Sequence, residues 1–216
     1  MQILLITATD AEIAPFISSS RSRINENKHS ITHLVTGVGM VATAYKTGVM
    51  LANNLFDIII NAGISGAIDR SLNQGEVVEV VEEQFYYFGA EDHDSFLSIF
   101  ELGLIDENEF PFVNKKLINN SDFQGLSFPG IKKVRGITVQ TVHGGENSIN
   151  QLTMRHPEAM VESMEGAAFF YAALLSKIPF IQLRAISNYV EPRNRSNWKI
   201  ELAIKNLNEY LIRILL

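Results

Sequence analysis

The stretch DIIINAGISGA, residues 57–67, decides the fold of this 216-residue chain. Residues 57–61 contain an uninterrupted run of three isoleucines, and continuous rather than alternating hydrophobicity is typical of a strand covered on both faces. Residues 61–67 then supply small side chains, with glycine at positions 63 and 66. We expect this part to follow the strand, either as a segment whose N–H groups approach a ligand or as a tight turn packed under a helix.

Similar apolar runs predict further buried strands, and a 3.6-residue periodicity predicts helices between them. Alternation of the two favours an α/β fold with three layers, α/β/α, around a central twisted mixed sheet. We expect residues 1–216 to form one such domain, because a chain of this length buries a sufficient core. The remaining predicted strands span residues 2–7, 32–36, 76–81, 134–141 and 180–187, and the predicted helices span residues 11–18, 41–55, 166–176 and 198–216.

Residues 84–130 interrupt the alternation of predicted strands and helices. Aromatic side chains such as Phe96 and Phe100 occur there among acidic and glycine-containing turns. A long insertion of this kind is typical of a lid or an interface. The predicted function of this segment is therefore to cover a site or to contact another chain.

Composition favours a small-molecule partner over nucleic acid, because the net charge of −6 gives no basic face to displace counterions. The chain has no cysteine, so thiolate metal sites and cysteine nucleophiles are excluded. No histidine pair stands at metal-ligand spacing, and we expect neither a metal nor a cofactor. The first strand lacks a basic flank and ends before Asp10, so we expect no signal peptide, no membrane span and a cytoplasmic protein.

Gly37 and Gly39 follow a predicted strand and open a helix, as in a dinucleotide-binding loop, but the third glycine is replaced by Ala42. No acidic residue lies at the sequence distance from these glycines at which dinucleotide-binding proteins hydrogen-bond the ribose. A strand-to-helix turn that needs glycine geometry is the alternative, and we favour it.

Polar side chains at the ends of buried strands are the candidate site residues, because open α/β sheets bind ligands there. Glu12 follows the first strand and can act as a general base, or it can simply complement a helix dipole. Glu162 and Glu165 flank Met164, which suggests a paired contact with vicinal hydroxyls. His143 can touch a base or sugar, or it can be structural.

These segments, in their order, resemble the nucleosidase branch of the purine nucleoside phosphorylase superfamily, typified by methylthioadenosine/S-adenosylhomocysteine nucleosidase. The matching residues are Glu12, 36–39, 61–66, 162–165 and 184–188. The resemblance implies that Glu12 activates water, that Glu165 holds the ribose hydroxyls and that Met164 packs against the sugar. It also implies substrate contacts from Ser65 and Gly66 and a homo-oligomer, a dimer or larger, in which a neighbouring subunit completes the pocket.

The chain departs from adenine-releasing members at Asn188, where they carry an aspartate that protonates purine N7. An amide is not an acid, but it can accept from N7–H and donate to a purine O6. Residues 187–195 look like those of futalosine hydrolases, which release hypoxanthine from a menaquinone precursor. The carboxylate on the 5′ arm of that nucleoside would suit Arg193 or Arg195, with aromatic contacts from the region of Phe96.

Two other functions fit parts of the sequence. A phosphorylase of this superfamily typically needs an arginine in the first loop, whereas residues 7–12 contain two acids and no arginine. A non-catalytic nucleoside-binding protein is consistent with the absence of an acid at Asn188, but such a protein would not need a general base at Glu12. The sequence therefore predicts hydrolysis of the N-glycosidic bond of a purine nucleoside.

Overall fold

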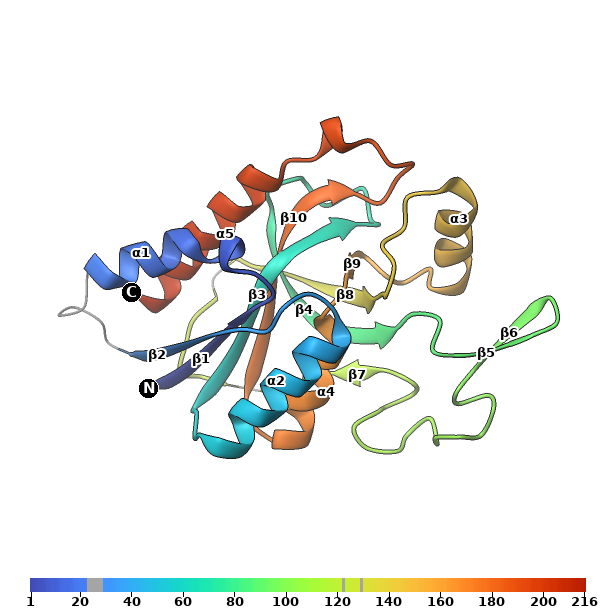
Figure 1. The fold of residues 1–216 in the computed structure, drawn as a ribbon, viewed down its shortest axis with the longest axis horizontal. Helices are drawn as coiled ribbons and strands as arrows, with labels where there is room; N and C mark the ends of the chain where they lie inside the picture. Colours follow the sequence, from blue (N-terminus) through green and yellow to red (C-terminus); the bar gives the residue numbers. More distant parts are fainter. Residues whose placement is uncertain (23–28, 122, 129) are drawn as a thin grey trace.

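A computed structural model describes residues 1–22, 29–121, 123–128 and 130–216 of the chain. Its centre is an eight-stranded mixed sheet with helices on both faces (Figure 1). The predicted three-layer α/β/α architecture is therefore confirmed. The main strands are β1 (Gln2–Thr7), β2 (Ser30–Val35), β3 (Ile58–Ala67), β4 (Val77–Phe85), β8 (Lys132–Thr138), β9 (Val161–Ser163) and β10 (Phe180–Tyr189).

Strand β3 is the centre of this sheet. Its first half pairs in parallel with β1, its last two residues pair with β9, and its other edge pairs with β10 along almost its whole length. Since β10, β4, β8 and β9 are joined in that order, the sheet closes on itself through β3. The carboxyl end of β3 is thus held from both sides.

This pairing corrects the expectation for residues 61–67, which continue the strand instead of turning after it. Small side chains predicted a turn, but partners on both edges hold the backbone extended to Ala67. Gly63 and Gly66 are needed because neighbouring side chains approach them closely, as described below, and not because a turn requires them.

Two pairs of helices cover the sheet, and each pair encloses an apolar core. Helices α1 (Ala14–Ser22) and α5 (Ile200–Leu215) lie on one face, and α2 (Met40–Asn53) and α4 (Gly166–Ser176) lie on the other (Figure 1). A further helix, α3 (Glu146–Arg155), was not predicted. Its sequence is mostly polar and only Leu152 is buried, so it lacks the high apolar content by which the other helices were predicted.

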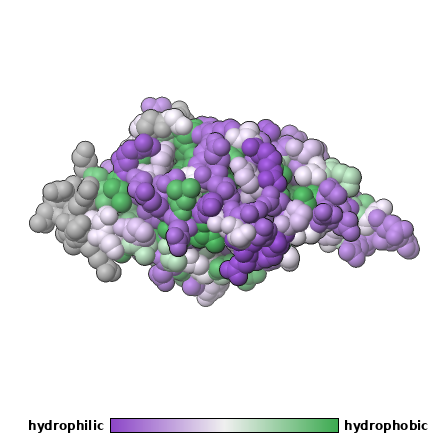
Figure 2. Space-filling view, turned by 90° about the horizontal axis from the view of Figure 1, so that it is seen from above, coloured by the Kyte–Doolittle hydropathy of each residue, from purple (hydrophilic) through white to green (hydrophobic). Residues whose placement is uncertain are grey.

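The insertion after β4 contains a hairpin, β5 (Gly89–Asp92) with β6 (Ser95–Ser98), and a short strand, β7 (Leu117–Ile118), that pairs with β4. The hairpin projects away from the sheet in Figure 1, and Figure 2 shows its end as a hydrophilic projection. The insertion is therefore anchored to the sheet by β7, while its hairpin extends into solvent.

In the described parts of the chain, no helix is both long and apolar enough to cross a membrane.

Candidate active site

A cavity of about 440 Å³ lies at the carboxyl ends of β1, β3 and β10. Its walls come from segments that are far apart in the sequence but meet because these strands are neighbours. Most of the predicted contact residues line it, whereas Phe96 and Arg195 do not. The predicted residues that line it are Glu12, Ser65, Gly66, Met164, Glu165, Asn188 and Arg193.

Glu12 occupies a short 3₁₀ helix (Asp10–Glu12) directly after β1, and only 8% of it is exposed. Its Oε2 accepts hydrogen bonds from Thr9 N at 2.9 Å and Thr9 Oγ1 at 3.0 Å, and its Oε1 accepts from Ile64 N at 3.1 Å. These donors occupy acceptor sites on both carboxyl oxygens and hold the side chain in place at the cavity wall.

Gly63 makes room for this carboxylate. A Cβ at position 63 would lie 2.9 Å from Glu12 Oε1 and 3.5 Å from Arg184 Nη1. The same observation places the Arg184 guanidinium beside Glu12. Glycine is therefore required here by close approach of two charged groups.

Arg184 is a site residue that the sequence analysis did not identify. It is 1% exposed, and burial lowers its pKa, while the carboxyl groups of Glu165, Glu83 and Glu12 oppose that change. An arginine in an apolar strand is a signal of a buried ion pair. Its three acidic neighbours come from other segments, so local sequence patterns could not identify them.

Glu165 precedes α4 and is held by the glycine turn at residues 37–39. Its Oε1 accepts a hydrogen bond of 2.9 Å from Gly39 N, and both Gly37 and Gly39 have positive φ angles of 89° and 95°. This geometry agrees with the interpretation as a strand-to-helix turn. Burial raises the pKa of Glu165, and Arg184 and the Gly39 N–H oppose the rise.

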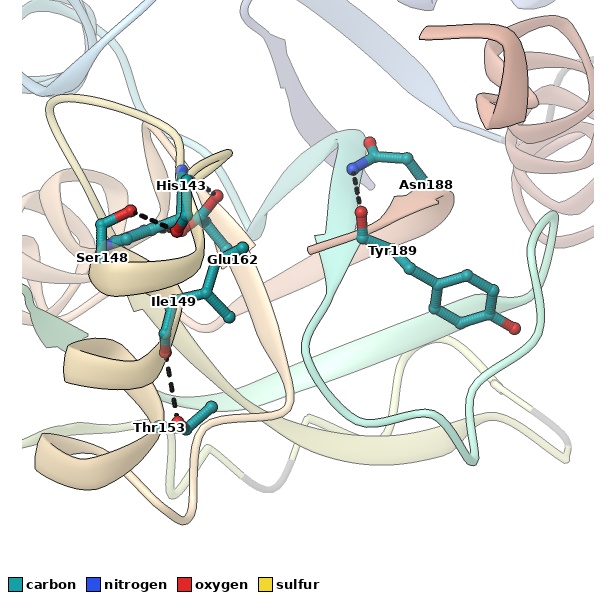
Figure 3. Close-up of polar contacts among 8 residues, drawn as sticks. His143, Ser148, Ile149, Thr153, Glu162, Asn188 and Tyr189 are labelled. Atoms are coloured by element: carbon teal, nitrogen blue, oxygen red, sulfur yellow. Dashed lines mark hydrogen bonds and ion pairs between the residues drawn. The ribbon is translucent and has the colours of Figure 1, made fainter. Parts of the chain in front are cut away.

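Asn188 lies near the end of β10 with a fixed amide orientation. Its Nδ2 donates to Tyr189 O at 2.9 Å (Figure 3), and Ser187 Oγ lies 2.8 Å from its Oδ1. The NH₂ group of Asn188 must face the carbonyl oxygen of Tyr189, because the amide oxygen of Asn188 would be repelled in that position. One N–H and one lone pair of Asn188 stay available. Gly66 permits this placement, because a Cβ there would lie 3.2 Å from Nδ2.

Glu162 and Glu165 do not form the pair that the sequence suggested. Both oxygens of Glu162 contact His143: Oε1 accepts from its backbone N at 3.0 Å, and Oε2 contacts Nδ1 (Figure 3). Of the two acids, Glu165 is thus the one available to hydroxyl groups in the cavity.

Arg193 and Trp198 also line the cavity, with the guanidinium carbon of Arg193 4.9 Å from the centre of the indole ring. Phe96 lies elsewhere, in β6. Its ring stacks on Tyr87 at 4.3 Å and lines a separate hollow of about 100 Å³. Within one chain, Phe96 is therefore not placed to contact a ligand in the main cavity.

Within the described ranges, no three His, Asp or Glu side chains form a group that could hold a metal ion. The cavity instead has acids at one end, Glu12 and Glu165, and a neutral amide from Asn188 on another wall. A carboxylate base, a hydroxyl-binding acid and an amide can together activate water next to a polyhydroxylated group and bind a heterocycle.

A family model described as "Phosphorylase superfamily" matches residues 3–215. This chain belongs to the phosphorylase superfamily. Futalosine hydrolase from Streptomyces coelicolor is 30% identical over 82% of this chain and 74% of that protein. The 5′-methylthioadenosine/S-adenosylhomocysteine nucleosidase of Haemophilus ducreyi is 23% identical over 100% of this chain and 92% of that protein.

A solved structure supports the fold. The methylthioadenosine/S-adenosylhomocysteine nucleosidase of Streptococcus pneumoniae, in complex with 8-aminoadenine, superimposes with a TM-score of 0.77. The match covers 98% of this chain and 97% of that one at 19% sequence identity. The two proteins therefore share the same fold over nearly their whole length.

Proposed function

We propose that this enzyme hydrolyses the N-glycosidic bond of a purine nucleoside, and that its substrate is futalosine, which yields hypoxanthine and dehypoxanthine futalosine. The observation that carries the proposal is the cavity that combines Glu12 with Asn188. The similarity to the Streptomyces coelicolor futalosine hydrolase supports the choice of substrate. The methylthioadenosine/S-adenosylhomocysteine-type nucleosidase is the alternative, since such relatives match the chain at lower identity.

In the proposed reaction, Glu12 takes a proton from a water molecule whose oxygen attacks C1′ of the ribose. The C1′–N9 bond breaks, its electron pair goes to the purine, and N7 of the purine takes a proton from solvent water. Glu12 then returns its proton to the solvent, so that the net reaction consumes one water molecule. Glu165 accepts hydrogen bonds from the ribose hydroxyls, and Met164 packs against the sugar. The Arg184 guanidinium lies beside Glu12, and its charge opposes the rise that burial causes in the pKa of Glu165.

Ser65 is proposed as a further substrate contact. Its side chain lines the cavity, and no described residue forms a hydrogen bond with its buried hydroxyl. A buried hydroxyl without a partner costs free energy, which a polar substrate atom would recover.

Asn188 selects the base in this proposal. Its available lone pair accepts from N7–H, and its available N–H donates to O6 of a 6-oxopurine. Adenine presents an NH₂ group at the second position, which faces the donor of Asn188. A mismatched polar contact of this kind costs about 1–3 kcal/mol, or roughly ten-fold to a hundred-fold in selectivity.

The substitution Asn188→Asp tests this assignment. A carboxylate repels O6 but accepts from the 6-amino group, so we expect the ratio of hypoxanthine to adenine release to fall about ten-fold or more. The ratio is measured by chromatography of the free base from matched 6-oxo and 6-amino nucleosides. An unchanged ratio would exclude Asn188 as the selecting residue.

The 5′ arm of the substrate is proposed to reach the cavity wall at Arg193. A guanidinium stacked on Trp198 retains its N–H groups for a carboxylate, and the indole offers an apolar surface to an aromatic ring. The guanidinium carbon of Arg195 also lies over the Trp198 ring, 5.7 Å from its centre. Arg193, which lines the cavity, is the proposed partner of the 5′ carboxylate, whereas Arg195 does not line it.

The direct test incubates the purified protein with futalosine, inosine, adenosine and methylthioadenosine, with and without phosphate. We expect hypoxanthine release from futalosine that does not depend on phosphate. A rate that requires phosphate would identify a phosphorylase, adenine release from methylthioadenosine would identify the alternative nucleosidase, and binding without base release would identify a non-catalytic protein.

A further inference from the structure

The proposed function leaves one polar pair in the cavity wall without a use. His143, in the loop after β8, and Glu162, in β9, both line the cavity, and their side chains are 5% and 4% exposed. Figure 3 shows this pair apart from Asn188 and carried by different elements. It therefore faces a different part of any ligand than Asn188 does.

The contacts of Glu162 determine the tautomer of His143. Its carboxylate accepts from the backbone N–H of His143 and contacts Nδ1 through its second oxygen. A carboxylate only accepts, so Nδ1 carries the proton and Nε2 of the neutral ring carries a lone pair. Tyr86 packs edge-on against the imidazole, with 4.7 Å between ring centres, and holds its plane. Among the described residues, none bonds Nε2.

The proposed function fixes which edge of the base meets this wall. If the sugar on N9 lies at Glu165 and the N7/O6 edge lies at Asn188, the remaining polar edge carries N1, C2 and N3. The other hydroxyl groups on the cavity wall, apart from Ser65, already have protein partners: those of Thr9, Ser163 and Ser187. The imidazole of His143 is thus a polar group that is both oriented and available.

We infer that Nε2 of His143 accepts a hydrogen bond from N1–H of a 6-oxopurine, so that His143 and Glu162 form a second specificity determinant besides Asn188. Hypoxanthine has a proton on N1, whereas adenine has a lone pair there. The lone pair of His143 therefore attracts the first base and repels the second. This inference rests on the proposed function, because the binding orientation is taken from it.

The first test needs no variant. Titration calorimetry on the unmodified protein compares hypoxanthine, 1-methylhypoxanthine and adenine, and we expect the N1-methyl compound and adenine to bind roughly ten-fold or more weakly. Equal binding of hypoxanthine and 1-methylhypoxanthine would overturn the inference. Because a methyl group also adds bulk, the same comparison is repeated on His143→Phe, in which the penalty for N1 methylation should fall to about three-fold or less.

Glu162→Gln tests the role of the tautomer. A glutamine can accept from Nδ1–H or donate to Nδ1, so it also permits the form with a proton on Nε2, which donates to N1 of adenine. We expect adenine binding to improve relative to hypoxanthine by about ten-fold. Val142→Ala, in the same loop and also lining the cavity, is the matched control and should change the affinity for both bases by the same factor.

The outcomes separate this inference from the proposed function. If the unmodified protein releases no hypoxanthine from futalosine, the proposed function fails, whatever the base titrations show. If it releases hypoxanthine but His143→Phe and Glu162→Gln leave the relative affinities for the three bases unchanged, the proposed function stands and the inference about His143 is wrong.

Discussion

Glu12 receives three hydrogen bonds from Thr9 and Ile64 and lies beside the Arg184 guanidinium. As the proposed general base, it should account for about 10²- to 10⁴-fold of the rate. We therefore expect Glu12→Gln to reduce kcat by that factor while hypoxanthine binding changes less than about three-fold. Stopped assays of base release and calorimetry measure the two effects.

Asp10 offers the matched control for that substitution. It lies in the same 3₁₀ helix but is exposed, and it does not line the cavity. Asp10→Asn should leave kcat within about two-fold of the unmodified protein. Turnover by Glu12→Gln at a comparable rate would contradict the role of Glu12 as the base.

Glu83 is the most deeply buried acid behind the site. Its Oε1 accepts from Gln182 Nε2 at 2.6 Å and its Oε2 from Thr138 Oγ1 at 2.9 Å, yet burial raises its pKa from 4.5 to about 7. The folded protein thus binds a proton here that the unfolded chain releases near pH 4.5. The stability from this proton is complete below pH 4.5 and is lost as the pH rises through 7.

This linkage predicts that the free energy of unfolding falls by roughly 3 kcal/mol over that pH range on account of Glu83. Glu83→Gln imitates the protonated acid and should remove most of that pH dependence. Urea denaturation at several pH values between 4 and 8 measures it. A variant whose stability varies with pH as steeply as the unmodified protein would show that Glu83 ionises normally.

Helix α5 anchors the segment that carries Glu12. Asn208, 1% exposed, accepts from Phe16 N at 2.8 Å and donates to Glu12 O at 2.8 Å. Asn208→Ala leaves these buried backbone groups without partners, so we expect a loss of about 1–3 kcal/mol in the free energy of unfolding. We also expect kcat to fall more than KM rises, because the base loses its support.

A nearby asparagine of the same helix separates the two effects. Asn206 Nδ2 donates to Gly75 O at 2.7 Å, away from the cavity. Asn206→Ala should lower stability by about 1 kcal/mol in chemical denaturation and leave kcat unchanged. Equal losses of kcat in both variants would indicate a general effect of helix α5 instead of a specific one.

Most elements of the fold were predictable, because buried strands and amphipathic helices have clear periodicities. The prediction for α4 matches residues 166–176, whereas β3 was predicted to end at Asn61. Local sequence indicated a turn there, and pairing with β9 and β10 is information that only the folded sheet contains. The role of Glu162 was hidden for the same reason, since its partner His143 is 19 residues away.

At the scale of the molecule, the exposed apolar residues on α2 favour a homo-oligomer, which we propose to be a dimer or larger. Val41, Tyr45 and Val49 are 79%, 71% and 47% exposed, and their spacing places them on one stripe of the helix. Val38, in the glycine turn just before α2, is 58% exposed and lines the cavity. A second copy on this face would therefore also border the site.

We expect Tyr45→Lys to shift the protein toward the monomer mass of 24.2 kDa in sedimentation equilibrium, because a charge at a buried interface is costly. Met154→Lys, on α3 and 74% exposed, is the control and should not change the mass. A monomeric unmodified protein, or an unchanged oligomer after Tyr45→Lys, would exclude this face as the interface.

The side chain of Glu83 occupies space that only glycine leaves free at two neighbouring positions, and this restricts how related chains can evolve. A Cβ at Gly166 would overlap Glu83 Oε1, and a Cβ at Gly136 would lie 2.6 Å from the same atom. A lineage therefore cannot acquire alanine at the start of α4 while it keeps glutamate at position 83. We expect relatives with alanine at that helix position to carry a smaller residue on the strand, so that the two sites mutate as a pair.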